Sequence, residues 1–209
     1  MNVVQKRAQD WAQMEPQLQV ADIILTRERT LLSAAVRKVT GSYWSHASII
    51  FAVPDKNVFF NNTLVISAEE KGIEIHRIQK YTQHFDFCDL GVKRVPGLSD
   101  EIREVVLSYV LNNVDIPYDF SRLFGFVFKY LENKFVKTEI NHMSKSFFNE
   151  NAFICSSFIQ KAFYAAAPAE KKESVIFKEN RSDSFFLEEV TPADIANSKN
   201  CDWVYNENC

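Results

Sequence analysis

The main period of the hydrophobic pattern changes at Pro96-Gly97. Before this point, short β-branched runs are separated by turn signals such as Pro54-Asp55, which predicts strands. After it, apolar residues recur every three or four positions, which predicts helices. The predicted strands cover residues 20–26, 46–53, 63–68, 73–78 and 88–95. Strands first and helices second indicate an α+β fold.

Helical spacing is also present in two segments before Pro96, one ahead of the first predicted strand and one between the first and second. The predicted helices cover residues 1–16, 29–39, 100–113, 120–131 and 152–166. Ser99 is the expected N-cap of the third helix, because a serine followed by acidic residues favours a helix start. The tail contains Pro192 and the apolar run 203–205, and is expected to be strand or coil.

The length of 209 residues suits a single domain over 1–209. We expect a strand half at about 20–95 and a helical half at about 98–170. The formal net charge of -3 gives no reason to expect a nucleic-acid partner. No secretory signal and no transmembrane segment is predicted, so the expected location is cytoplasmic, or exported without a Sec signal.

The cysteines favour a reducing compartment. Their four positions (Cys88, Cys155, Cys201 and Cys209) form no CxxC pair and no regular spacing. We therefore expect no metal site and no cofactor, while a Cys201–Cys209 disulfide stays open.

Cys155 is the candidate nucleophile. It lies near the start of the predicted helix 152–166, and a helix N-terminus favours a thiolate and offers N–H groups to an oxyanion. The competing interpretation is a small buried residue on an apolar helix, which is the commoner role of a single cysteine.

His46 is the candidate base. It begins a predicted strand, where alternation places it on one face with Ser48 and Ile50. An imidazole on a strand packed against the cysteine helix could take the thiol proton. His76 is expected to be exposed, and His84 and His142 are expected in loops.

Several short motifs, taken in order, resemble the strand and helix halves of NlpC-type papain-like hydrolases. They are Ala21-Asp-Ile-Ile-Leu, Ser45-His46-Ala-Ser-Ile, Val65-Ile-Ser-Ala68 with Gly72-Ile73, Ile116-Pro-Tyr118, Phe153-Ile-Cys155-Ser156-Ser and Val190-Thr-Pro192-Ala-Asp194. Because the histidine half precedes the cysteine half, the chain resembles the circularly permuted YaeF/YiiX-like branch. More distant relatives are the lecithin:retinol acyltransferase-like enzymes. The resemblance implies a papain-like fold in which an antiparallel sheet or small barrel packs on the nucleophile helix.

The resemblance also implies roles for individual residues. Cys155 matches the nucleophile, His46 the general base, and Tyr118 a tyrosine beside the nucleophile. Ser67 occupies the usual place of the residue that orients the imidazole, where permuted relatives usually have an acid. Glu69 lies two residues on, on the same face of the strand, so we favour Glu69 with Ser67 as the alternative.

Two positions depart from the pattern of the family. Ala21 replaces a glycine, a mild change for a strand start. Ile154 replaces the aspartate that binds a free substrate amine in cell-wall enzymes, which argues against that specificity.

Aromatic residues beside the expected site suggest a substrate pocket. Tyr43 and Trp44 immediately precede the Ser45-His46 motif, and at least one of them should line the mouth of the cleft. Ser156, next to the nucleophile, is assigned to substrate binding with them. The phenylalanines after Tyr118 repeat at helical spacing and are better explained by core packing.

The leading hypothesis is a thiol hydrolase that cleaves an amide bond in a peptide or aminoacyl conjugate. The alternative is a lipid acyl-ester hydrolase or acyltransferase, in which the Phe-rich segment 120–135 would contact an acyl chain or membrane. A third hypothesis is a binding module that keeps the fold without turnover.

Overall fold

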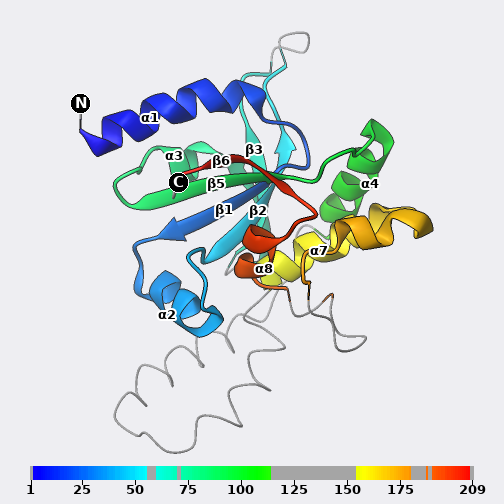
Figure 1. Ribbon diagram of the computed structural model, residues 1–209. Helices are drawn as coiled ribbons and strands as arrows, with labels where there is room; N and C mark the ends of the chain where they lie inside the picture. Colours follow the sequence, from blue (N-terminus) through cyan, green and yellow to red (C-terminus); the bar gives the residue numbers. More distant parts are fainter. Residues whose placement is uncertain are drawn as a thin grey trace, which may run out of the picture.

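The computed structural model describes residues 2–55, 60–69, 72–113, 154–179, 187 and 190–207. Its centre is a six-stranded antiparallel sheet in the order β4-β3-β2-β1-β5-β6 (Figure 1). The strands are β1 (Ile23–Glu28), β2 (His46–Ala52), β3 (Leu64–Glu69), β4 (Gly72–Arg77), β5 (Cys88–Arg94) and β6 (Asp202–Asn206). Among the described residues, β4 and β6 are the two ends of this sheet.

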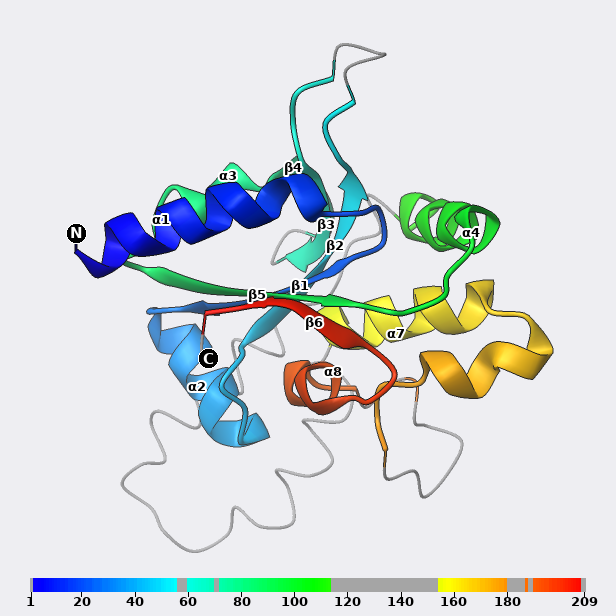
Figure 2. The ribbon, with the colours of Figure 1, turned by 45° about the horizontal axis from the view of Figure 1, so that its top comes forward.

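Helices cover both faces of the sheet. They are α1 (Val3–Met14), η1 (Glu15–Gln17), α2 (Leu31–Thr40), α3 (Gln79–Thr82), α4 (Asp100–Leu111), α7 (Ile154–Ala166), η4 (Ala169–Val175) and α8 (Pro192–Asn197). Figure 2 shows α1 and α3 on one side of the sheet and α2, α7 and α8 on the other.

Alternation along the strands produces two separate cores. Ile23 and Ile49 point to the face that also contains Phe158 and Phe163 of α7. Residues of the opposite parity, such as Ile50, pack with side chains of α1 and α3. Both faces are apolar because each is covered by helices, so the central strands are hydrophobic on nearly every residue.

Most predicted elements are observed within one or two residues, and Ser99 caps α4 by accepting from the Ile102 backbone N–H. The tail agrees with the prediction at 203–205, which lie in β6, and differs from it at Pro192, where a short helix, α8, begins. Thr191 and Asp194 form a reciprocal capping box, and proline suits the first turn of a helix since its missing N–H would have no partner there. The predicted helix 120–131 lies outside the described residues.

Ala21 has the left-handed backbone conformation, with φ of 69°. Only glycine adopts this region without steric strain, which explains the glycine of the related motif. The alanine methyl group is buried in the core on the α7 face. The change from glycine is therefore less mild than the sequence suggested, because backbone strain accompanies the gain in packing.

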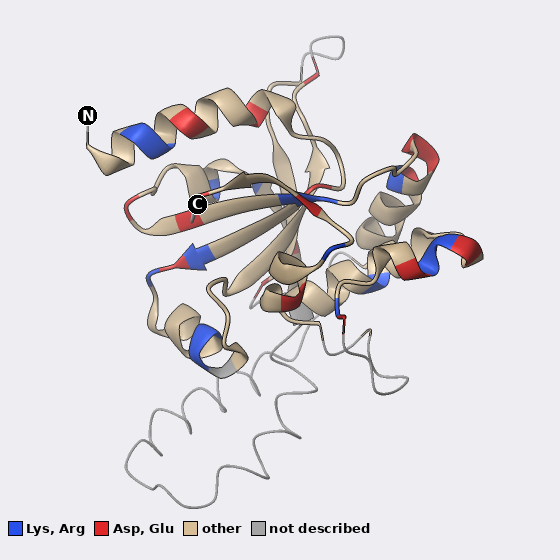
Figure 3. Ribbon diagram, viewed as in Figure 1, with Lys and Arg blue, Asp and Glu red and all other residues tan. Residues whose placement is uncertain are grey.

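Charged residues lie mainly on the helices and at the ends of strands (Figure 3). Asp22, which is paired with Arg94, and Lys93 are buried exceptions, and two further polar centres are built on the sheet. One surrounds Glu69 at the end of β3, and the other surrounds Asp89 near the start of β5. No helix in the described part of the chain is long and apolar enough to cross a membrane.

Candidate active site

Cys155 is the second residue of α7 as described, and this helix packs on β2 and β3. Phe158, Ile159 and Phe163 bury the sheet-facing side of the helix. Gln160 ties α7 to the end of η4 and the segment that follows it. Its side chain donates to the Val175 carbonyl at 2.9 Å and accepts from the Phe177 backbone N–H at 2.8 Å. The thiol is thus carried by a firmly packed element.

His46 begins β2, directly beside Cys155. The register pairs Ser48 with Ser67, which places Glu69 across from His46 on the neighbouring strand. The His46 Nε2 atom lies 3.7 Å from Glu69 Oε1 and has no hydrogen-bond partner among the described residues. The imidazole therefore lies between a sulfur and a carboxylate, although these come from residues 86 positions apart in the chain (155 − 69).

The charges of this group favour an ion pair. Burial raises the pKa of the Cys155 thiol, but the charge and hydrogen bond of His46 and a backbone hydrogen bond from Ala47 bring it below its ordinary value. Burial lowers the pKa of His46, but Cys155 and then Glu69 raise it to about 9. A thiolate beside an imidazolium is the form that these shifts favour near neutral pH.

Glu69 is held by donors other than His46. Its Oε1 atom accepts from Ser67 Oγ at 2.6 Å and from Lys80 Nζ at 2.5 Å. Burial raises the pKa of Glu69, while His46, Lys80 and Ser67 together lower it to about 2. The carboxylate is therefore ionised, and Ser67 contacts the acid rather than replacing it.

Tyr81 positions the segment that carries Lys80. It is 1% exposed, and its hydroxyl lies 3.1 Å from both Ser48 Oγ and His76 Nε2. The Lys80 ammonium lies 5.6 Å from the centre of the Tyr81 ring. One turn of helix, anchored in the core by its tyrosine, thus places a lysine over the carboxylate of β3.

His76 is half-buried, so the prediction that it is exposed was wrong. Its ring packs edge-on against Tyr81 at 5.4 Å, because α3 folds back over the edge strand. Burial and the charge of Lys80 lower the pKa of His76 to about 4, which keeps this imidazole neutral. His84 is exposed in a turn, as predicted, and His142 lies outside the described residues.

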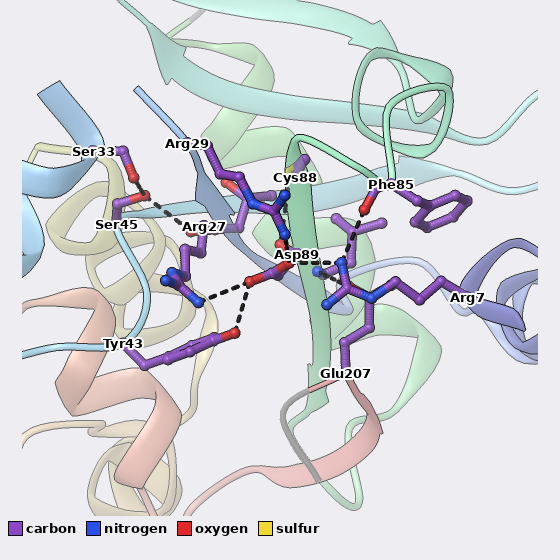
Figure 4. A network of polar contacts seen from close by, with 12 residues as sticks. Arg7, Arg27, Arg29, Ser33, Tyr43, Ser45, Phe85, Cys88, Asp89 and Glu207 are labelled. Atoms are coloured by element: carbon purple, nitrogen blue, oxygen red, sulfur yellow. Dashed lines mark hydrogen bonds and ion pairs between the residues drawn. The ribbon is translucent and has the colours of Figure 1, made fainter. Parts of the chain in front are cut away.

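Tyr43 and Trp44, predicted to bind substrate, contact other groups in the structure. The Tyr43 hydroxyl donates to Asp89 Oδ2 at 2.7 Å (Figure 4). Trp44 is 3% exposed and packs at 6.0 Å from Trp203. Gly91 makes this packing possible, since a Cβ atom there would lie 2.9 Å from both tryptophan rings. Burial on this scale leaves Trp44 no surface for a substrate in the structure described.

Of the other two predicted residues, Ser156 lies on α7 next to Cys155. Ser156 is fully buried, with its Oγ 3.9 Å from Cys155 Sγ, so it adjoins Cys155 from the interior rather than from the solvent side. A weak sulfur hydrogen bond at this distance supports the thiolate. Tyr118 lies outside the described residues.

Sequence reasoning missed Lys80 and the whole Asp89 centre. Ile78 and Tyr81 are three residues apart, a spacing that could have indicated a helical turn packed on the core with Lys80 beside it. Nothing comparable identifies Asp89, whose partners come from α1, β1 and the segment before β2.

Comparison with known proteins adds a family to this geometry. The family of permuted papain-like amidase enzymes, YaeF/YiiX, C92, matches residues 17–205. The chain belongs to this family. Membership confirms the predicted permuted papain-like fold and supports hydrolysis of an amide bond as its coarse activity. No curated protein sequence matches the chain.

A solved structure similar to this permuted papain-like amidase is that of metalloprotein yiiX from Escherichia coli O157:H7. The TM-score is 0.55 at 19% identity, over 91% of this chain and 98% of the other. This likeness supports the fold alone. In the described ranges of this family member, no group of three or more His, Cys, Asp or Glu side chains could hold a metal ion.

Proposed function

We propose that the chain is a thiol amidase that hydrolyses an amide bond in a peptide or aminoacyl conjugate through an acyl-enzyme on Cys155. The observation that carries this proposal is the electrostatic pairing of Cys155 with His46, with Glu69 behind the imidazole. A cysteine that is merely buried would have a raised pKa. Cys88 is an example, because burial raises the pKa of its thiol to about 12.

In the first half-reaction, the Cys155 thiolate attacks the carbonyl carbon and forms an S–C bond. The π electron pair of the C=O bond moves onto the carbonyl oxygen. As the tetrahedral intermediate collapses, the C–N bond breaks and the His46 imidazolium gives its proton to the leaving amine. Since Nε2 faces Glu69, we assign the proton transfer to Nδ1.

In the second half-reaction, neutral His46 takes a proton from water, which attacks the thioester. The carboxylic acid leaves and the thiolate–imidazolium pair is restored. Glu69 stabilises the imidazolium in both steps, the role that a carboxylate has in a triad. Tyr118 and backbone N–H groups of α7 are the proposed donors to the oxyanion.

Alkylation by a thiol probe at pH 7, with the modified residue identified by peptide mass spectrometry, tests the proposal. The wild-type protein should be labelled at Cys155, Cys155→Ala should lose that label, and His46→Ala should react at least about 100-fold more slowly. Cys88→Ala is the matched control, because its buried thiol has a raised pKa and should contribute no labelling.

If wild-type Cys155 reacts no faster than a free thiol, the proposal of an enzyme is contradicted. The hypothesis of a binding module without turnover would then remain. Hydrolysis of an aminoacyl amide library separates the remaining two functions. Release of amine without lipid supports the amidase, whereas activity that requires liposomes or detergent, on acyl esters, would favour the lipid enzyme.

A further inference from the structure

The oxygen that faces His46 is shared by three groups. Glu69 Oε1 lies 2.6 Å from Ser67 Oγ, 2.5 Å from Lys80 Nζ and 3.7 Å from His46 Nε2. The first two distances are those of strong hydrogen bonds, while the third is too long for one. In the structure described, the lysine holds the carboxylate and the histidine does not.

The His46 Nε2 atom is buried and has no partner among the described residues. A buried ring N–H without an acceptor is unfavourable, and more so when the ring is charged. A carboxylate 3.7 Å away would remove the penalty with a small side-chain rotation. What opposes that rotation is the charged hydrogen bond from Lys80.

The backbone at Lys80 is anchored, while the end of its side chain is partly exposed. Tyr81, the next residue, is anchored by Ser48 and His76 in the core, so the backbone of α3 cannot move far. The ammonium itself is 39% exposed and contacts the tyrosine ring. The backbone is therefore held in place. The ammonium at the end of the side chain can still swing toward solvent and release Glu69.

The charged and titratable groups around His46 come from four elements: Cys155 on α7, Glu69 on β3, His76 on β4 and Lys80 on α3. His76 is neutral near pH 7, as shown above. Lys80 is therefore the one cation among these described neighbours, and its charge opposes that of the imidazolium.

We propose that Lys80 is a positioning residue of this site, which holds Glu69 away from His46 in the resting enzyme and limits how strongly the carboxylate supports the imidazolium. The inference rests on the proposed function for its catalytic meaning. Its physical content, a lysine that weakens the His46–Glu69 pair, does not depend on turnover.

Titration of the His46 ring signals by NMR in the full-length protein tests this inference. The chain has four histidines, so the missing signals in His46→Ala assign the ring. Lys80→Met should raise the pKa of His46 by ~0.5 unit or more, because a nearby cation is lost and Glu69 is free to bind Nε2. Lys80→Arg, the matched variant, keeps the charge and should keep the wild-type value.

An unchanged or lower His46 pKa in Lys80→Met would overturn the inference, provided that the variant keeps the wild-type spectrum elsewhere. Lys80→Ala gives a second variant if the methionine disturbs folding. In a hydrolysis assay of Lys80→Met, the alkaline limb of the pH–rate profile should move to higher pH by the same amount as the pKa of His46. A protein whose Cys155 is unreactive while Lys80→Met still raises the His46 pKa would refute the amidase and keep the lysine's role.

Discussion

Two carboxylates on the sheet are surrounded by donors in different ways. Asp89 on β5 is 2% exposed and accepts from Arg7 at 2.8 Å, from Arg27 at 3.0 Å and from Tyr43 at 2.7 Å. Glu69 on β3 is 24% exposed and has two donors within 2.6 Å, with His46 at 3.7 Å. The first carboxylate is saturated, whereas the second leaves its third neighbour without a bond.

The difference is consistent with a structural role for Asp89 and with the proposed catalytic role for Glu69. Around Asp89, donors from α1, β1 and the loop before β2 converge, and Figure 4 shows them pointing inward from these separate segments. Such a centre ties segments together and gains nothing from movement. Around Glu69, the 3.7 Å between the carboxylate and the His46 ring leaves room for the change of partner proposed above.

The largest effect should follow from removing the charge of Asp89. Asp89→Asn leaves Arg7 and Arg27 facing a neutral amide, and breaking a buried ion network should lower the free energy of unfolding by about 3 kcal/mol. Urea unfolding at pH 7 measures this loss. The rate of Cys155 alkylation in the folded protein should stay unchanged. A large fall in that rate would show that the Asp89 centre and the Cys155 site are coupled.

Glu69→Gln should show the opposite pattern. The rate of hydrolysis should fall by about 100-fold, because the imidazolium loses its carboxylate. Since Glu69 raises the pKa of His46, the alkaline limb of the rate profile should move to lower pH. The free energy of unfolding should change by less than about 1 kcal/mol, because Lys80 is partly exposed. Equal losses in stability for Glu69→Gln and Asp89→Asn would contradict the comparison.

Acid should remove the contribution of Asp89. Burial raises its pKa, but the Tyr43 hydrogen bond and the charge of Arg7 lower it below the ordinary 3.8. A carboxylate with a lowered folded-state pKa stabilises the protein above its unfolded-state pKa, and the effect is lost as pH falls through the folded value. The difference in unfolding free energy between wild type and Asp89→Asn should therefore narrow below pH 3.8. A gap that stays constant down to pH 2 would point to packing instead of charge.

The smallest effects come from removing one hydroxyl at each centre. Tyr43→Phe deletes a hydrogen bond to a buried charge and should lower the free energy of unfolding by about 1.5 kcal/mol. Ser67→Ala deletes the matching bond to Glu69 and should slow hydrolysis roughly fivefold, with little loss of stability. Thermal unfolding and steady-state rates on both variants check the contrast. A lower rate of hydrolysis in Tyr43→Phe would instead support the predicted role of Tyr43 in substrate binding.

Local patterns account for much of the molecule. Alternating β-branched residues and turn signals predicted five strands to within about three residues at each end, because each strand buries side chains on its faces. The helix in the tail was harder to predict, since the capping box of Thr191 and Asp194 is only four residues long and overlaps the first turn of a helix of six residues. A pattern this short is easily outweighed by the proline within it.

By itself, the sequence determined the order of the two halves and was enough to propose the pair Cys155 and His46, since a histidine strand before a cysteine helix is visible in the motifs. The tertiary structure alone decided which groups surround that pair. Strand register brought Glu69 opposite His46, and a buried tyrosine brought Lys80 onto the same oxygen. Tyr43, two residues from the motif, points instead to Asp89, 46 positions away. Such contacts depend on distances in space between residues far apart in the chain, on which local periodicity carries no information.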